Sequence, residues 1–297
     1  MENGGFTGES KSILLEELPD HLVPKGLKFK HSMSMAWIKT KIDEAGLEFP
    51  MIVKPDRGQR GWHVKKVESF KELEQYLKHH NIDFILQEFI DLPEEYAVLI
   101  FRYPKAIVYR INSVTQKEFL TVTGNGKMTL KELIMAKPRA KLQYSRLKEE
   151  HDHELHEIIP REEVVELGKI GNHCKGTMFK NANHLINKKM IAAFEPILKE
   201  LKGVYFARFD LKCKSVEDLY TGENIKIVEV NGVGAEPAHI YDPKYPLLRG
   251  WFDLLKHWSI IAGIARENRK NGHPYSTWKE FKIARAKYFE YRRSAFH

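Results

Sequence analysis

The feature of the sequence that most constrains its fold is a pair of strand-like segments, residues 204–214 (VYFARFDLKCK) and 224–231 (NIKIVEVN). Side chains along a strand point alternately to its two faces. One face of the first segment is apolar, with Tyr205, Ala207, Phe209 and Leu211. The other carries Phe206 and three ionisable residues, Arg208, Asp210 and Lys212. Buried charges are costly unless they are paired, so the second face is either a polar site or a solvated sheet face. The first segment alone favours the solvated face.

The second segment changes this balance. With regular alternation, one of its faces carries Ile225, Ile227, Glu229 and Asn231. We expect the two segments to pair as a hairpin, which sets Glu229 and Asn231 beside Asp210. Two carboxylates and an amide oxygen form an all-oxygen ligand set suited to Mg²⁺, which keeps several waters and needs few protein ligands. The alternative is a carboxylate that caps a neighbouring loop, and the three residues together favour the metal.

Hydrophobic spacing and capping signals predict the other elements. Helices are expected at 33–46, at 69–78 after a capping box of Ser69 and Glu72, after a second box of Thr129 and Glu132, at 187–201, and over most of the chain from 244. Strands are expected at 49–55, at 83–90 and, on either side of Tyr103-Pro104, within 95–112. Strands and helices mix without strict β-α-β alternation, which predicts an α+β fold with largely antiparallel sheets.

A loop with two glycines follows one of these strands. Segment 52–64 (IVKPDRGQRGWHV) carries Lys54 on the strand and then Gly58 and Gly61 in the loop. Glycines let backbone N–H groups approach phosphate oxygens, and a lysine supplies a point charge. The spacing fits neither the P-loop nor the dinucleotide-binding fingerprint. On these residues alone, a plain hairpin is the preferred interpretation.

Segment 86–98 (LQEFIDLPEEYAV) is a short connection between two strands, the second of which begins near Glu95. Such a connection can present backbone groups to an adenine edge, and a carboxylate can accept hydrogen bonds from ribose hydroxyls. An ordinary acidic turn explains this segment equally well.

The order of these motifs resembles the ATP-grasp superfamily over roughly residues 11–243. Segments 124–134 (GNGKMTLKELI) and 168–179 (GKIGNHCKGTMF) look like parts of cyanophycin synthetases. Segments 206–210 (FARFD) and 228–243 (VEVNGVGAEPAHIYDP) are similar to D-alanine–D-alanine ligases. The resemblance implies two α+β lobes that clasp ATP, and transfer of the γ-phosphate to a carboxylate whose acyl phosphate an amine then attacks. The implied organisation is a lead-in at 1–30, a small lobe at 31–90, a large lobe at 91–243 and a basic helical segment at 244–297.

The resemblance also implies a role for each matching residue. Lys54, and Lys11 in the lead-in, would contact the ATP phosphates, and the loop from Arg57 to Val64, with Gly58 and Gly61, would cover the triphosphate. The adenine hinge would comprise Gln87, Glu88, Phe89 and Ile90, and Glu95 would bind ribose. Mg²⁺ would be held by Asp210, Glu229 and Asn231. Arg208, supported by Lys212, would stabilise charge on the transferring phosphoryl group. Residues 232–239, with Gly232, Gly234 and His239, would border the acyl acceptor.

Two departures from the family pattern stand out. The family loop commonly reads K-P-x-x-G-x-x-G-x-G-V, and His63 replaces its third glycine. Only about thirty residues precede the first core helix, so a substrate domain is reduced, cut off or supplied by a partner. These departures, together with the basic C-terminal tail, motivate a second hypothesis: a non-catalytic nucleotide-binding module that docks on a partner or an anionic surface through this tail. Retention of Asp210, Glu229 and Asn231 favours the enzyme.

Composition bounds the setting. The 297-residue chain has no apolar run of 18 residues, and its start lacks the pattern of a secretory signal. Its two cysteines, Cys174 and Cys213, are far apart and in no metal spacing. Reduced thiols in a cytoplasmic protein are therefore expected.

The last part of the chain is strongly basic. The net charge is +8, and residues 265–297 contain nine Lys or Arg and three Glu, an excess of +6. Such a segment could bind nucleic acid or an anionic membrane surface, but a solvated helix is the preferred interpretation because the charge has no motif attached to it. Before it, Trp251, Phe252, Leu254, Leu255 and Trp258 lie at helical spacing. Core packing is expected for them, with a membrane-surface helix as the alternative.

Overall fold

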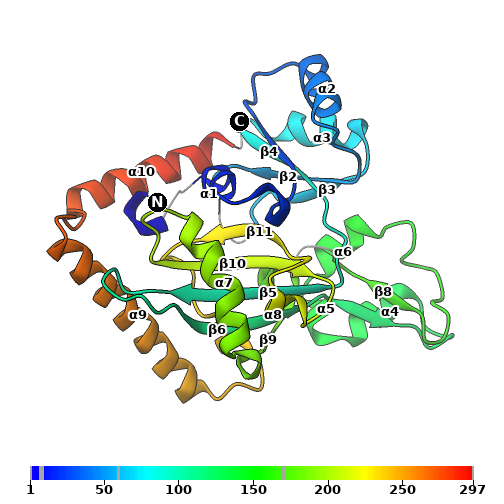
Figure 1. Cartoon of the computed structure of the whole chain (residues 1–297). Coiled ribbons are helices and arrows are strands. Elements are labelled where there is room, and N and C mark those ends of the chain that lie inside the picture. The colour runs from blue at the N-terminus through cyan, green and yellow to red at the C-terminus, as the bar shows by residue number, and fades with distance from the viewer. Residues whose placement is uncertain (1, 7–9, 59–60, 169–170, 296–297) are drawn as a thin grey trace. The chain divides into compact units, whose positions relative to one another are not determined.

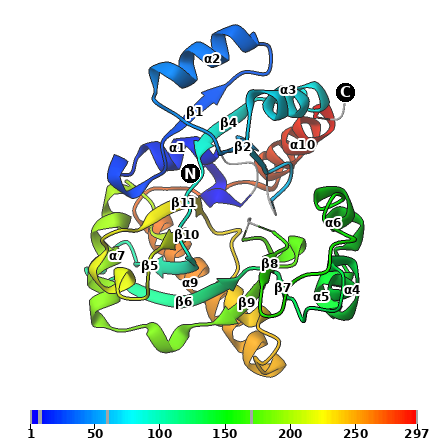
Figure 2. The same cartoon turned by 90° about the vertical axis from the view of Figure 1, so that its right-hand side faces the viewer.

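The computed structural model describes residues 2–6, 10–58, 61–168 and 171–295 (Figures 1 and 2). The chain divides into two compact units. One comprises Met1–Gln116 and Asn181–His297, and the other comprises Lys117–Lys180.

The first sheet of the larger unit is antiparallel, with the strand order β1-β4-β2-β3. Its strands are β1 (Gly26–Phe29), β2 (Met51–Pro55), β3 (Lys65–Val67) and β4 (Phe84–Glu88). Helices α2 (Met35–Glu44) and α3 (Phe70–His79) pack on one face through a core that includes Ile38, Leu73, Val53 and Leu86. Because side chains alternate along a strand, Lys54 and Gln87 are left on the opposite face.

The predicted helices of this sheet are confirmed, with one correction at a cap. Ser69 caps α3 by accepting a hydrogen bond from the backbone N–H of Glu72. The Glu72 carboxylate, however, accepts from the N–H of Glu68. The predicted capping box is therefore only half formed, because the second bond of a box must return to the N-cap residue itself.

The second sheet has the strand order β11-β10-β5-β6-β9. Its strands are β5 (Glu94–Phe101), β6 (Arg110–Glu118), β9 (Met178–Asn181), β10 (Phe206–Cys213) and β11 (Lys226–Asn231). Helix α7 (Lys188–Glu200) covers one face through residues such as Phe194. Helix α9 (Leu247–Lys270) covers part of the other, with Ile260 and Ile264 against Leu99, Phe101 and Phe206. Figure 1 shows α7 and α9 beside this sheet.

Shorter elements complete the larger unit. Helix α1 (Lys11–Glu16) contacts β11, and α8 (Asp218–Thr221) joins β10 to β11. Helix α10 (Trp278–Ser294) follows α9 and begins with a complete capping box of Thr277 and Glu280. The 3₁₀ helices are η1 (Glu2–Gly5), η2 (Asp20–Leu22), η4 (Asn183–Leu185) and η5 (Ala238–Tyr241).

The smaller unit has its own core. It contains a two-stranded antiparallel sheet of β7 (Thr121–Thr123) and β8 (Val164–Glu166), with helices α4 (Leu130–Ala136), α5 (Pro138–Lys141) and α6 (Tyr144–Glu150) and the 3₁₀ helix η3 (His173–Lys175). Leu130, Ile134, Leu147 and Leu167 are fully buried in it. The predicted capping box of Thr129 and Glu132 is complete at the start of α4.

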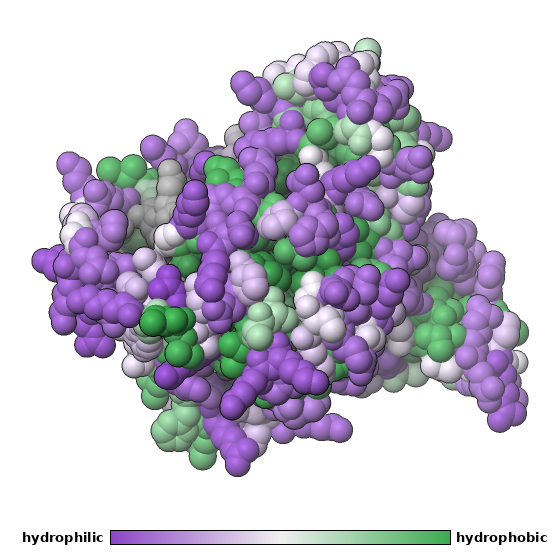
Figure 3. All heavy atoms as spheres, viewed as in Figure 1, coloured by the Kyte–Doolittle hydropathy of each residue, from purple (hydrophilic) through white to green (hydrophobic). Residues whose placement is uncertain are grey.

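The expectation that the large apolar residues in the first half of α9 pack in the core was wrong. Trp251, Phe252 and Leu255 are 64%, 70% and 68% exposed. The reason is that the sheet offers α9 an apolar surface only around Leu99, Phe101 and Phe206, and the helix meets it with its other side. Within the described ranges, no helix combines the length and hydropathy needed to span a membrane. On the face drawn in Figure 3, hydrophilic side chains predominate, with hydrophobic ones between them.

Candidate functional site

A β-bulge in β11 brings two polar residues to the charged face of β10. The predicted hairpin is confirmed, with Arg208 opposite Asn231 and Asp210 opposite Glu229. The next pair is Leu211 with Ile227, so Val228 is an extra residue in β11. An extra residue reverses the alternation of side chains along a strand. The expectation that Ile225 and Ile227 share a face with Glu229 was therefore wrong, since both isoleucines lie in the core under α7.

On the polar face, Arg208 and Asp210 form a buried ion pair with two hydrogen bonds. Arg208 Nε donates to Asp210 Oδ1 at 2.8 Å, and Arg208 Nη2 donates to Oδ2 at 3.1 Å. Asp210 is 5% exposed. Burial lowers the pKa of the Arg208 guanidinium, but the Asp210 carboxylate outweighs this, so the pKa is raised. The two-bond geometry holds the guanidinium in one orientation.

Two lysines approach the same region from the other parts of the unit. Lys54 Nζ donates to Gln87 Oε1 at 2.7 Å and to the carbonyl of Val228, the bulge residue, at 3.2 Å. Lys11 Nζ lies 3.7 Å from Glu229 Oε1. Burial and the nearby charge of Lys11 lower the pKa of Lys54 to about 8, against the raising effect of Glu229.

The charges of this cluster do not balance. Three cationic side chains, Lys11, Lys54 and Arg208, face two carboxylates, Asp210 and Glu229. Among these five side chains the cations exceed the carboxylates by one, while Asp56 and Glu236 add negative charge near Lys54 and Arg208.

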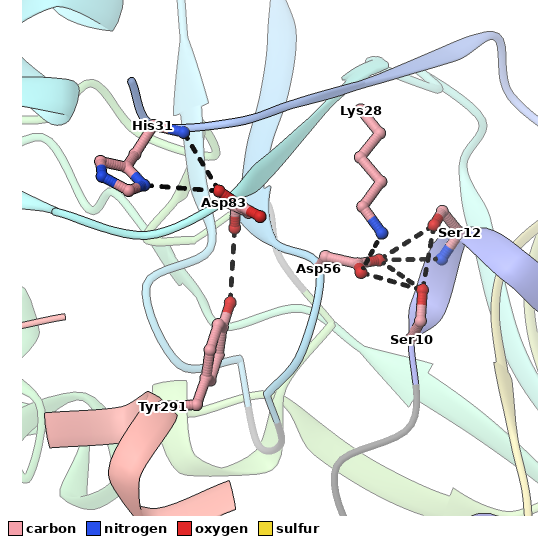
Figure 4. A network of polar contacts seen from close by, with 7 residues as sticks. All are labelled: Ser10, Ser12, Lys28, His31, Asp56, Asp83 and Tyr291. Atoms are coloured by element: carbon pink, nitrogen blue, oxygen red, sulfur yellow. Dashed lines mark hydrogen bonds and ion pairs between the residues drawn. The ribbon is translucent and has the colours of Figure 1, made fainter. Parts of the chain in front are cut away.

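Asp56 anchors this arrangement, and the sequence reasoning missed it (Figure 4). Its carboxylate accepts hydrogen bonds from Ser10 Oγ at 2.8 and 2.9 Å, from Ser12 N at 3.2 Å and from Lys28 Nζ at 2.6 Å. Burial raises the pKa of Asp56, but the bonds from Lys28 and the two serines outweigh it, so the pKa is lowered. The Asp56 carbonyl also accepts from the N–H of Lys11 at 3.0 Å, which fixes the start of α1. The signal in the sequence that could have identified Asp56 was its position two residues after Lys54.

The glycine loop keeps a glycine-like backbone despite its departure from the family pattern. His63 has a φ of 52°, in the left-handed region that favours glycine, as does Gly61 with a φ of 66°. The carbonyl of His63 accepts a hydrogen bond from Tyr76 Oη at 2.9 Å, and its ring bonds His80 at 2.8 Å. Arg57, Gly58 and Gly61 are described, whereas residues 59–60 of the predicted phosphate loop lie outside the described residues.

The hinge residues diverge in their contacts. The Gln87 side chain bonds Lys54, and the Glu88 carboxylate accepts from the N–H of Lys25 at 3.2 Å. Lys66 and Lys212 lie 4.5 Å and 5.4 Å from the centre of the Phe89 ring.

Lys212 also donates to the carbonyl of Ile90 at 2.9 Å. Glu95, which is 4% exposed, is its register partner on β5. These contacts place Lys212 at the predicted hinge, two residues along the strand from Asp210.

The segment predicted to border an acceptor follows Asn231 and contacts the ion pair, because Arg208 Nη1 donates to the carbonyl of Glu236 at 3.3 Å. The N–H of Val233 donates to the carbonyl of Gly4 at 2.8 Å, and a Cβ on Gly234 would lie 3.0 Å from the carbonyl of Phe6. Gly232 and Gly234 thus lie beside the start of the chain.

His239 is 2% exposed, and its Nε2 lies 3.0 Å from Asp253 Oδ2. Burial lowers the pKa of His239, against the effect of Asp253. Tyr245 Oη donates to the same Asp253 oxygen at 2.6 Å. Among the interactions of the described residues, none joins His239 to Asp210 or Glu229.

The predicted metal ligands form a partial set. Among the described residues, no three His, Cys, Asp or Glu side chains come together as metal ligands. The predicted set has only two carboxylates, those of Asp210 and Glu229, which are register partners. In the part of the chain that the structure describes, the side-chain amide nitrogen of Asn231 is buried without a hydrogen-bond partner. This N–H group can donate to a phosphate oxygen, whereas the amide oxygen is the atom suited to Mg²⁺.

His257 on α9 is a further buried group that the sequence reasoning did not identify. It is 0% exposed, and neither ring nitrogen has a hydrogen-bond partner within the described part of the chain. Burial lowers its pKa to about 4, against the effect of Glu236 and with that of Arg208. Between its ordinary pKa and about 4, the unfolded chain takes up the proton more readily, so this group lowers stability as the pH falls through that window.

We therefore expect His257→Phe to be more stable at neutral pH, by about 1–3 kcal/mol, because two unpaired polar atoms are removed. The ring keeps its edge contact with Phe206. The variant should also lose less stability on acidification. Urea unfolding at neutral pH and near about pH 5 measures both effects, with the exposed His153→Gln as control. A loss on acidification equal to that of the original chain would contradict this assignment.

A protein-family model matches part of this chain. It describes the RimK-like ATP-grasp domain, and it matches residues 24–143. A search of curated proteins returned no match. Among solved structures, the VanG D-Ala:D-Ser ligase from Enterococcus faecalis is 15% identical, with a TM-score of 0.47, over 86% of this chain and 60% of that one.

Two other solved structures show a similar level of likeness. The D-alanine–D-alanine ligase from Bacillus anthracis is 14% identical, with a TM-score of 0.49, over 90% of this chain and 72% of that one. The bifunctional glutathione synthetase from Pasteurella multocida is 15% identical, with a TM-score of 0.39, over 90% and 38%. The chain thus spans 60% of the VanG ligase and 38% of the glutathione synthetase. On the family-model match, residues 24–143 resemble a RimK-like ATP-grasp domain.

Proposed function

We propose that this protein is an ATP- and Mg²⁺-dependent carboxylate–amine ligase. The observation that carries the proposal is the convergence of three cationic side chains, Lys11, Lys54 and the paired Arg208, on Asp210 and Glu229. Such a site suits a triphosphate, whose own charge then recruits the metal. The match of residues 24–143 to the RimK-like ATP-grasp domain supports the same reaction class.

In the proposed reaction, an oxygen of the substrate carboxylate attacks the γ-phosphorus of ATP, and the bond to ADP breaks. An amine then attacks the acyl carbon, phosphate leaves, and the amine loses a proton as the amide forms. Arg208 stabilises negative charge on the transferring phosphoryl group, because Asp210 holds its guanidinium in place. Lys54 and Lys11 hold the phosphate oxygens.

Mg²⁺ would neutralise negative charge on the phosphate groups of the nucleotide. Asp210, Glu229 and Asn231 are the residues that would hold it. Within the proposed organisation, residues 31–90 and 91–243 supply the two lobes around the nucleotide, and Phe89, Ile90 and Glu95 supply the adenine and ribose contacts.

The reaction is tested with hydroxylamine as a general nucleophile, since the natural amine is not identified. The full chain is incubated with ATP, Mg²⁺ and a panel of carboxylic acids and short peptides, and ADP and hydroxamate are measured together. At least one acid should give ADP and hydroxamate in equal amounts. Saturable nucleotide binding without ADP or hydroxamate from any acid would instead favour a non-catalytic nucleotide-binding module.

A further inference from the structure

An apolar stripe runs along the exposed side of the first half of α9. Its residues are 43–74% exposed: Leu247, Leu248, Trp251, Phe252, Leu255 and Trp258. At about 100° per residue they fall on one side of the helix. The buried residues of α9, among them Gly250, His257, Ile260 and Ile264, fall on the opposite side. The stripe is therefore a second apolar face of the helix and not the edge of the core. Exposed hydrophobic residues that are scattered singly over a surface are common, but a continuous stripe of them is not.

Positive charges surround this stripe. Arg249 and Lys256 lie along one edge, Lys244 precedes it, and exposed Arg266, Arg269 and Lys270 follow it. The helix has two acidic residues, and both are engaged by other segments. Asp253 bonds His239 and Tyr245, and Glu267 accepts from the N–H of Lys105. The surface around the stripe is therefore cationic.

We propose that α9 lies on an anionic membrane surface, with the stripe inserted between lipids and the flanking cations on headgroups. Leucine, tryptophan and phenylalanine on one side, framed by lysine and arginine, are the composition of helices that lie in the membrane interface. The charge selects this occupant over a second copy of the chain, because pairing two α9 faces would bring the cations of one against those of the other. Leu247, Leu248 and Leu255 also need an apolar partner, which lipid supplies.

The test uses the full chain and sedimentation with vesicles of phosphatidylcholine alone or mixed with phosphatidylserine. Binding to the mixed vesicles at low salt is expected, with weaker binding as salt rises. The double variant Trp251→Ser/Phe252→Ser should reduce partitioning at least about tenfold, because two large exposed side chains no longer enter the membrane. Both residues are exposed, so its melting temperature should be close to that of the original chain.

Two more variants sharpen the test. Arg249→Gln/Lys256→Gln should weaken binding to the anionic vesicles and leave the low affinity for neutral vesicles unchanged. Trp278→Ser, which removes a 68% exposed tryptophan from α10, should bind as the original chain does.

Three results would overturn the proposal. One is the absence of binding to anionic vesicles at low salt. Another is binding that Trp251→Ser/Phe252→Ser leaves unchanged. The third is a dimer, detected by light scattering, that the same double variant dissociates, since the stripe would then be covered by a second copy.

Discussion

Lys54→Met is expected to weaken the binding of an ATP analogue by about 10–100-fold, the loss expected from one charge-assisted hydrogen bond. The Lys54 amine is buried and lies between Gln87 and the carbonyl of Val228, where it connects the two sheets of the larger unit. Methionine has a similar stem and fills the same space without the charge. Titration calorimetry with a non-hydrolysable ATP analogue measures the effect.

The same variant should change how stability depends on pH, apart from the cost of leaving Gln87 Oε1 and the Val228 carbonyl without this donor. Because burial lowers the pKa of Lys54 to about 8, the unfolded chain holds this proton more strongly, and Lys54 therefore lowers stability below that pH. Between about 8 and its ordinary pKa, the stability of the original chain rises with pH on account of this group, and the rise should be absent from Lys54→Met. Lys65→Met, on the exposed side of β3, serves as control. Equal nucleotide affinity in the original chain and Lys54→Met would show that the lysine does not contact the nucleotide.

Glu229→Gln is expected to reduce Mg²⁺-dependent ADP formation by about 100–1,000-fold, the range for removal of one group that stabilises transition-state charge. The side chain is 31% exposed, so glutamine should leave the fold intact. The substitution removes one of two carboxylates that face three cations. It therefore raises the positive excess, and nucleotide affinity in the absence of Mg²⁺ should rise while Mg²⁺-dependent turnover falls.

This opposite pair of effects separates a metal ligand from a residue that only supports the fold, which would lower both. Glu223→Gln, an exposed glutamate in the same hairpin, should change neither quantity. Turnover of Glu229→Gln equal to that of the original chain would remove Glu229 from the proposed metal site.

The hairpin of the site was predictable because its signal is local. Charged residues at every second position of β10 indicated a polar face, and the glutamate and asparagine at the end of β11 had to lie near it. The bulge at Val228 was not predictable, because an extra residue leaves the composition of a strand unchanged and shows only in the pairing. The assumption of regular alternation along β11 correctly placed Glu229 beside Asp210, but it placed Ile227 on the wrong face of the sheet.

Contacts between distant segments were the other gap. Asp56 binds Ser10, Ser12 and Lys28, and no spacing in the sequence relates these four residues. Likewise, the pattern of α9 shows that apolar residues surround the helix, but not that the sheet covers only one side. Patterns predict elements and faces, whereas the surface available to cover a face depends on the whole fold.

The central claim is that the cationic cluster of Lys11, Lys54 and Arg208 binds a nucleotide triphosphate together with Mg²⁺. Calorimetric titration of the full chain with a non-hydrolysable ATP analogue, with and without Mg²⁺, tests it most directly. We expect a single saturable site that Mg²⁺ strengthens, and no binding of Mg²⁺ alone, because Asp210 and Glu229 are each already paired with a cationic side chain. Tight binding of Mg²⁺ alone, or no heat from the analogue in either condition, would contradict the account.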